Sequence, residues 1–227
     1  MPLSTTTGLW LMLFAIEVKN SGACMQISYE ITKDSRLLNE YYQVREHCYQ
    51  QELKLPSFDG SEEPEDREGY IFVAKNNDYC LGGARITDNV EALLSNMSLC
   101  DLMLKLDLVP GTCCVWERLA VSHEFRDSRS QPEFCDQLAG ASRSLGYDYA
   151  LMVSSVKNAR FYRLCHSMLN IPFKICSQIK CAPSGAFSQL EHVLSVAQLK
   201  PDRVANVAPE KNHYFAPRYQ PYYGVAA

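Results

Sequence analysis

The chain has 227 residues, of which 47% are hydrophobic and 21% charged, and its formal net charge is −4. These values suit one globular α/β domain with a sizeable core, and the negative charge argues against non-specific binding of nucleic acid. Ten cysteines are present, but none form a CxxC pair, so the sequence predicts no metal site. Isolated cysteines in apolar segments are typical of a reducing compartment, which predicts a cytoplasmic protein.

The first apolar run covers residues 9–16 and reads LWLMLFAI. No basic residue precedes it and Glu17 ends it, so it resembles neither a signal peptide nor a membrane-spanning helix. We expect residues 1–25 to be an apolar N-terminal segment that packs on the body of the protein. A peripheral contact with a membrane is the alternative.

Alternating and helical patterns mark residues 26–200 as one folded domain, followed by a C-terminal tail at 201–227. The patterns predict strands at 26–32, 70–75, 79–87, 113–121, 147–155 and 171–181. They predict a helix capped by Asp34 or Ser35 and one or two short helices at 93–106. Further helices are predicted from Pro132 to Leu145, at 158–169 and at 186–199. An acidic loop at 56–68 precedes the first hairpin. In the helix at 158–169 we expect Phe161, Cys165 and Met168 to face inward.

The strand at 113–121 carries two adjacent charges, Glu117 and Arg118, among apolar neighbours. Residues two apart share a face of a strand, so we expect these two side chains to point to opposite faces. Loss of hydration among apolar neighbours would prepare Glu117 as a general base. The alternative is a structural ion pair of Glu117 with Arg85 or Arg45.

The order of strand, helix, acidic loop and hairpin, followed by RLAVSHEFRDSRS and VKNARFYRLCHSML, resembles the GNAT acyltransferases. Within that superfamily, YYQVREHCYQQEL, GGARIT and WERLAV look similar to the acyl-homoserine lactone (autoinducer) synthases and the long-chain N-acyl amino acid synthases. The resemblance covers about residues 27–175. It implies a three-layer α/β fold whose central mixed, mainly antiparallel sheet is flanked by helices.

By position, the resemblance implies substrate-binding roles for four residues, Arg45, Tyr49, Asp66 and Arg85. Of these, Arg45 or Arg85 is the candidate clamp for a substrate carboxylate.

The strand residues of WERLAV carry the remaining implied roles. Glu117 and Arg118 would be catalytic, and the acyl thioester would lie against Leu119, Ala120 and Val121. Autoinducer synthases place their glutamate further before this arginine, which favours the amino acid synthases.

The turn after this strand departs from GNAT enzymes that use coenzyme A. Arg129 and Gln131 stand where a glycine and a small residue would leave bare amides for the pyrophosphate. The sequence therefore predicts a phosphopantetheine-linked donor and no bound cofactor. Acyl carrier proteins are acidic and suit a basic rim, which we expect to consist of Arg126, Arg129, Lys157 and Arg160.

Together these features predict an N-acyltransferase that moves a long-chain fatty acyl group from acyl carrier protein to the α-amine of an amino acid, with tyrosine favoured. Glu117 would take the ammonium proton and the amine would attack the thioester directly. Residues 9–16 and 93–106 are candidates for an acyl tunnel or else belong to the core. The alternatives are an acyl-homoserine lactone synthase that uses S-adenosylmethionine, and a non-catalytic module that binds acyl carrier protein or lipid. Leu55, standing near the place of the lactone makers' tryptophan, argues against the first alternative.

Overall fold

The structure, a computed structural model, describes residues 26–77, 79–93, 98–108, 111–127, 129–179, 181, 187 and 191–200. The segments expected at 1–25 and 201–227 lie outside these residues. Within the described part of the chain, no helix is both long and apolar enough to cross a membrane.

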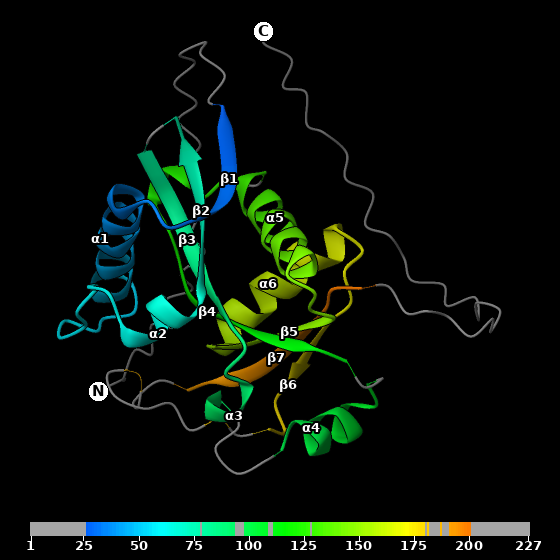
Figure 1. Ribbon diagram of the computed structural model, residues 1–227. Helices are drawn as coiled ribbons and strands as arrows, with labels where there is room; N and C mark the ends of the chain where they lie inside the picture. The colour runs from blue at the N-terminus through cyan, green and yellow to red at the C-terminus, as the bar shows by residue number, and fades with distance from the viewer. Residues whose placement is uncertain are drawn as a thin grey trace, which may run out of the picture.

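A sheet of seven strands runs through the centre of the molecule in the order β1-β2-β3-β4-β5-β7-β6 (Figure 1). The strands are β1 (Ile27–Thr32), β2 (Tyr70–Asn76), β3 (Tyr79–Thr87), β4 (Cys113–Val121), β5 (Tyr149–Ser154), β6 (Phe173–Cys176) and β7 (Val193–Gln198). Neighbouring strands pair antiparallel except β4 and β5, which are parallel. The sheet is therefore mixed and mainly antiparallel, as the sequence predicts.

Helices cover both faces of this sheet (Figure 1). They are α1 (Ser35–Gln51), α2 (Pro64–Glu68), α3 (Val90–Leu93), α4 (Leu99–Leu106), the 3-10 helix η1 (His123–Phe125), α5 (Ser130–Ser144) and α6 (Val156–Met168). Tyr41 and Tyr49 of α1 pack with one face of β2, whereas Phe134 and Leu138 of α5 pack with the other. α4 buries Leu102 against β4, β5 and β7. The predicted three-layer arrangement is confirmed.

Local hydrogen bonds fix where the helices begin. Asp34 accepts bonds from the N–H groups of Arg36 and Leu37, which confirms it as the N-cap of α1. The predicted acidic loop contains the short helix α2. α5 begins at Ser130, two residues before the predicted start at Pro132, because the Asp127 carboxylate already accepts the N–H of Ser130.

The predicted helix at 186–199 is wrong in its described residues. Residues Val193–Gln198 form β7, which is inserted between β5 and β6. Helices are distinguished from buried strands by a polar face, but this strand is covered on both faces and carries few polar residues. The backbone hydrogen bonds of this segment with β5 and β6 stabilise it as a strand.

The inward face of α6 also differs from the prediction. Cys165 is buried as expected, but Phe161 and Met168 are 41% and 61% exposed. The buried stripe instead includes Ala159 and His166. α6 is therefore rotated about its axis relative to the expectation, and it presents an apolar and basic surface to solvent.

Candidate active site

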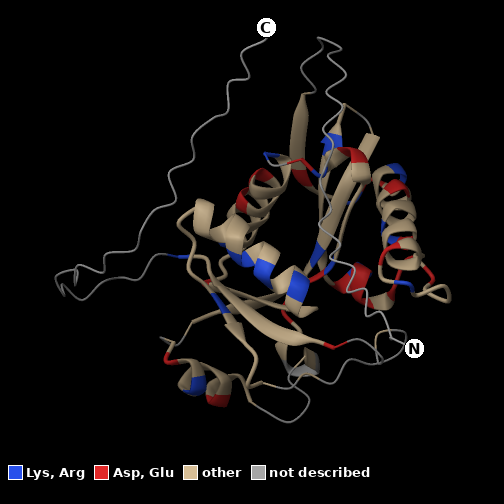
Figure 2. Cartoon of the chain, turned by 180° about the vertical axis from the view of Figure 1, so that it is seen from behind, with Lys and Arg blue, Asp and Glu red and all other residues tan. Residues whose placement is uncertain are grey.

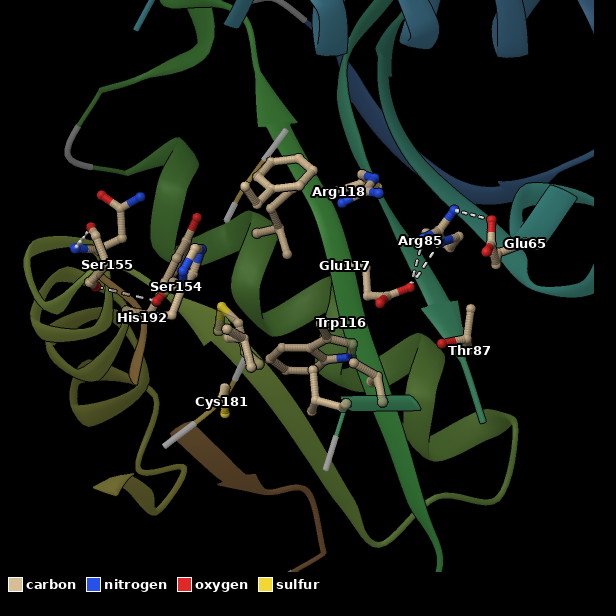
Figure 3. Close-up of a pocket in the computed structure, with 18 of the residues that line it drawn as sticks. Glu65, Arg85, Thr87, Trp116, Glu117, Arg118, Ser154, Ser155, Cys181 and His192 are labelled. Atoms are coloured by element: carbon tan, nitrogen blue, oxygen red, sulfur yellow. Dashed lines mark hydrogen bonds and ion pairs between the residues drawn. The ribbon is translucent and has the colours of Figure 1, made fainter. Parts of the chain in front are cut away.

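β4 and β5 separate after a short stretch of parallel pairing. They pair only from Cys113 with Tyr149 to Val115 with Leu151. Beyond this point the strands diverge (Figure 1) and a cavity of about 640 Å³ lies between them. Its walls come from α2, the end of β3, both diverging strands and the N-terminus of α6 (Figure 3).

A β-bulge in β4 sets the directions of Glu117 and Arg118. Arg85 pairs with Glu117 and Gly83 pairs with Ala120, so β4 has one more residue than β3 between these two pairs. Arg118 adopts a φ of 53°, in the left-handed region. Both Glu117 and Arg118 consequently line the cavity (Figure 3). The expectation of opposite faces is therefore wrong, since strict alternation holds only in a regular strand.

Glu117 forms an ion pair with Arg85, the structural partner weighed from the sequence. The Nε and Nη2 atoms of Arg85 lie 2.9 Å and 2.8 Å from Oε2 of Glu117. Both contacts end on Oε2, and Oε1 has no partner among the described residues. Because the Glu117 side chain is 30% exposed and lines the cavity, this second oxygen is available to a ligand.

Arg85 is the centre of a network of charges. Its Nη1 atom donates to Glu63 at 2.8 Å and to Asp66 at 3.0 Å. Burial alone would lower the pKa of Arg85, but the carboxylates of Glu117, Asp66 and Glu63 outweigh it and raise the pKa. The Arg85 side chain is only 3% exposed, so its charge is already balanced by protein carboxylates.

Glu63 holds Arg118 in place by a bidentate contact. Nε and Nη2 of Arg118 donate to the two carboxylate oxygens at 2.7 Å and 2.8 Å. The guanidinium carbon of Arg118 also lies 4.7 Å from the ring centroid of Phe187. Within the described residues, Nη1 of Arg118 has no hydrogen-bond partner. One edge of this arginine is therefore fixed and the other remains for a ligand.

Two predicted substrate-binding residues, Arg45 and Asp66, lie behind the cavity wall. Arg45 donates to Asp66 at 2.9 Å and to the carbonyl groups of Gly60 and Ser61. Both side chains are fully buried. They position the loop that carries Glu63 and α2, and neither lines the cavity.

The predicted acyl-binding residues divide between the cavity and the core. Leu119 and Tyr49 line the cavity, and the Tyr49 hydroxyl lies 3.4 Å from the Leu119 carbonyl. Burial raises the pKa of Tyr49 to about 12, so this hydroxyl keeps its proton. Ala120 and Val121 are buried, at 3% and 7% exposure, and neither lines the cavity.

The four residues of the predicted basic rim have different surroundings. Arg126 folds back onto the end of β4, donating to the Val121 carbonyl at 2.8 Å and to Glu52 at 2.7 Å. Arg129, Lys157 and Arg160 are exposed, and Lys157 lines the cavity. Figure 2 shows basic residues following one another along α6.

Several cavity residues were not assigned from the sequence, namely Tyr162, Ser154, Ser155, Asn158 and His192. Burial raises the pKa of Tyr162, so its hydroxyl keeps a proton that it can donate. The segment NARFY that carries Asn158 and Tyr162 supported the resemblance, and its tyrosine could have been assigned. Glu63 could not, since it is one of many acids in its loop. The described residues include no group of three or more metal-binding side chains.

This fold, with a sheet that splays at a parallel strand pair over a charged cavity, is shared with acyl-homoserine lactone synthases and acetyltransferases of known structure. Among solved structures, the chain is similar to the AHL synthase LasI, at 15% identity and a TM-score of 0.54 over 78% of this chain and 92% of that one. It is similar to the CoA-dependent acyl-homoserine lactone synthase BjaI with MTA, at 10% identity and a TM-score of 0.53 over 74% of this chain and 78% of that one. It is also similar to an acetyltransferase from Streptococcus agalactiae, at 11% identity and a TM-score of 0.51 over 76% of this chain and 98% of that one. No protein-family model and no curated protein matches the sequence.

These likenesses confirm the fold class that the sequence predicts, and the resemblance to both autoinducer synthases and GNAT enzymes. At such identities they concern the fold.

Proposed function

We propose that the protein is an N-acyltransferase that moves a long-chain fatty acyl group from acyl carrier protein to the α-amine of an amino acid. The proposal rests on two side-chain atoms of β4 that have no hydrogen-bond partner among the described residues. Oε1 of Glu117 and Nη1 of Arg118 belong to adjacent residues that line one cavity. An α-amino acid has an ammonium and a carboxylate on one carbon, which are opposite in sign to the Glu117 carboxylate and the Arg118 guanidinium.

The clamp for the substrate carboxylate is Arg118 in this proposal. Arg45 is fully buried, and Arg85 already contacts three carboxylates. Arg118 is held by Glu63 on one edge, so its other edge is pre-oriented for a second carboxylate. Hydrogen bonds to a charged group of this kind are worth about 1.5–3 kcal/mol.

Glu117 acts as the general base. It takes one proton from the ammonium, and the free amine then attacks the thioester carbonyl, which lies against the backbone of Leu119, Ala120 and Val121. As the C–N bond forms and the C–S bond breaks, Tyr162 protonates the departing thiolate and is restored by the proton that the new amide nitrogen loses. General-base catalysis contributes about 10²–10⁴-fold, and no acyl-enzyme is needed.

The turn before α5 supports a donor without a nucleotide. Asp127 accepts the N–H groups of Arg129 and Ser130 at 2.7 Å each, and the Ser130 hydroxyl at 2.8 Å. The carboxylate therefore occupies the amides that a pyrophosphate would otherwise use. Adding a phosphate there would bring it against this negative charge.

The exposed face of α6 supports an acidic protein as the carrier of the donor. Lys157 and Arg160 lie on it beside Phe161, Leu164 and Met168, which are 41–62% exposed. A basic and apolar surface beside the cavity suits an acidic partner that inserts a phosphopantetheine arm. Arg129 lies near the start of α5 and extends the positive charge, whereas Arg126 is engaged with Glu52.

The proposal is tested by expressing the chain in a bacterial host and analysing the lipid extract by mass spectrometry against an empty-vector control. The expected result is a new set of masses equal to a fatty acyl group plus one amino acid, with tyrosine the acceptor that the resemblance favours. If no such masses appear, and purified protein with acyl-carrier thioesters and amino acids also yields none, the proposal is wrong.

The second candidate function is synthesis of acyl-homoserine lactones, favoured by the similarity to LasI and BjaI. The same extract distinguishes it, because the lactones would appear in place of acyl amino acids and would depend on S-adenosylmethionine.

A further inference from the structure

One end of the cavity contains a buried hydroxyl group that nothing in the described structure engages. Thr87, the last residue of β3, is 7% exposed, and its Oγ1 atom has no hydrogen-bond partner among the described residues. The side chain lines the cavity, and Figure 3 shows its oxygen turned toward Trp116 and Glu117. Leaving a buried hydroxyl unpaired is unfavourable, so a ligand that reached this point would gain by bonding to it.

Three carboxylates also line the cavity, two from α2 and one from the residue that follows Thr87. Glu65 and Glu68 of α2 and Asp88 after β3 all line the cavity and are exposed. Glu65 lies 4.0 Å from Arg85, and none of the described cations forms an ion pair with Glu68 or Asp88. This end of the cavity therefore has hydrogen-bond acceptors in excess and attracts a group that donates hydrogen bonds.

The register of the sheet gives the distance of this end from the proposed base. Arg85 pairs with Glu117 and Thr87 pairs with Val115, with regular pairing between them. Thr87 thus lies two residues along the same face, at about 6.8 Å from the position of Arg85. An amino acid side chain built from bonds of about 1.5 Å spans a distance of this order from its α-amine to a terminal polar group.

We propose that Thr87, with Glu65, Glu68 and Asp88, forms a subsite for the far end of the acceptor's side chain and selects amino acids that carry a hydrogen-bond donor there. The inference rests on the proposed function for the role of the α-amine at Glu117. The donor is a phenolic hydroxyl or an ammonium group; both donate to a hydroxyl oxygen or a carboxylate. Tyrosine is therefore preferred to phenylalanine, and lysine to norleucine.

Binding to the purified full-length chain, measured by titration calorimetry without any acyl donor, tests the subsite directly. Tyrosine is compared with phenylalanine and lysine with norleucine, because each pair differs in the terminal donor. A preference of roughly tenfold or more within at least one pair is expected, since one hydrogen bond to a charged group is worth about that factor. Whichever pair discriminates identifies the phenol or the ammonium as the group that is read.

Variants then assign the preference to the subsite. Thr87→Val keeps the shape and β-branching of the side chain and removes the hydroxyl, and Glu68→Gln removes one charge; each is expected to reduce the preference several-fold. Thr87→Ser restores a hydroxyl and is expected to retain it. Glu124→Gln, an exposed change outside the cavity, is the matched control. Thermal unfolding of each variant verifies that it is folded.

Equal binding within both pairs, or a preference that survives Thr87→Val and Glu68→Gln, overturns the inference, as does an absence of binding by all four amino acids. Its failure is distinguishable from that of the proposed function. Acylated amino acids formed without selectivity would leave acyl transfer standing and remove the subsite. Selective binding without any acyl transfer would do the reverse.

Discussion

Replacing Arg85 with glutamine is predicted to destabilise the protein strongly. The network contains three arginines and three carboxylates, Arg45, Arg85, Arg118, Glu63, Asp66 and Glu117. The substitution leaves three carboxylates with two cations. Removing one partner of a buried ion pair costs about 3–5 kcal/mol.

The lower end of that range applies here. Asp66 keeps its contact with Arg45, and Glu117, at 30% side-chain exposure, can be rehydrated from the cavity. We therefore expect a loss of about 3 kcal/mol in the free energy of unfolding. For a chain of this length that corresponds to a fall of roughly 6–12 °C in the midpoint of thermal unfolding.

Urea denaturation followed by circular dichroism measures this loss. The matched control is Arg67→Gln, which breaks the exposed pair of Arg67 with Glu62 and is expected to have a far smaller effect. A loss below about 1 kcal/mol for Arg85→Gln would contradict this prediction, because it would mean that the buried carboxylates do not depend on this cation.

Burial alone would raise the pKa of Glu63, but the surrounding arginines lower it. The ionised Glu63 therefore stabilises the fold above its ordinary pKa of 4.5, and this stabilisation is lost as the pH falls. In acid titrations, wild type should lose stability below this pH more steeply than Glu63→Gln. Arg118→Gln should raise the KM for the amino acid about 10–100-fold and abolish discrimination against the amino acid amide in steady-state kinetics. The double charge reversal Lys157→Glu with Arg160→Glu should raise the KM for acyl carrier protein at low salt, whereas Lys105→Glu on α4 should not. Equal effects of the two changes would contradict docking of the carrier protein on the exposed face of α6.

The order of elements was predictable from the sequence because it rests on local patterns. Asp34 could be identified as an N-cap. The paired glycines Gly82 and Gly83 are typical of a β-bulge or a close backbone approach, and the observed register shift between β2 and β3 falls next to Gly82, between its pair with Ala74 and the pair of Cys80 with Lys75. The strand β7 could not be recognised, since it is buried on both faces and only its neighbours distinguish it from a helix.

The candidate site was predictable in its residue types but not in its geometry. Glu117 and Arg118 were predicted as catalytic charges, and both line the cavity. The observed ion pair of Glu117 with Arg85 was among the expected alternatives. The bulge at Arg118 carries no glycine or other signal in the sequence, yet it turns both charges to one cavity. The burial of Arg45 and the contacts of Glu63 depend on how a distant loop folds back onto α1, which no local pattern encodes.

In the proposed reaction, Glu117 is the general base for acyl transfer to an amino acid. The most direct measurement incubates purified protein with an acyl-carrier thioester and an amino acid, and follows free carrier thiol together with the acylated product. Thiol and product are expected in equal amounts and only when the amino acid is present. Glu117→Gln is expected to lower the rate by about 10²–10⁴-fold while the variant stays folded. An unchanged rate in Glu117→Gln, or thiol release without acylated amino acid, would contradict it.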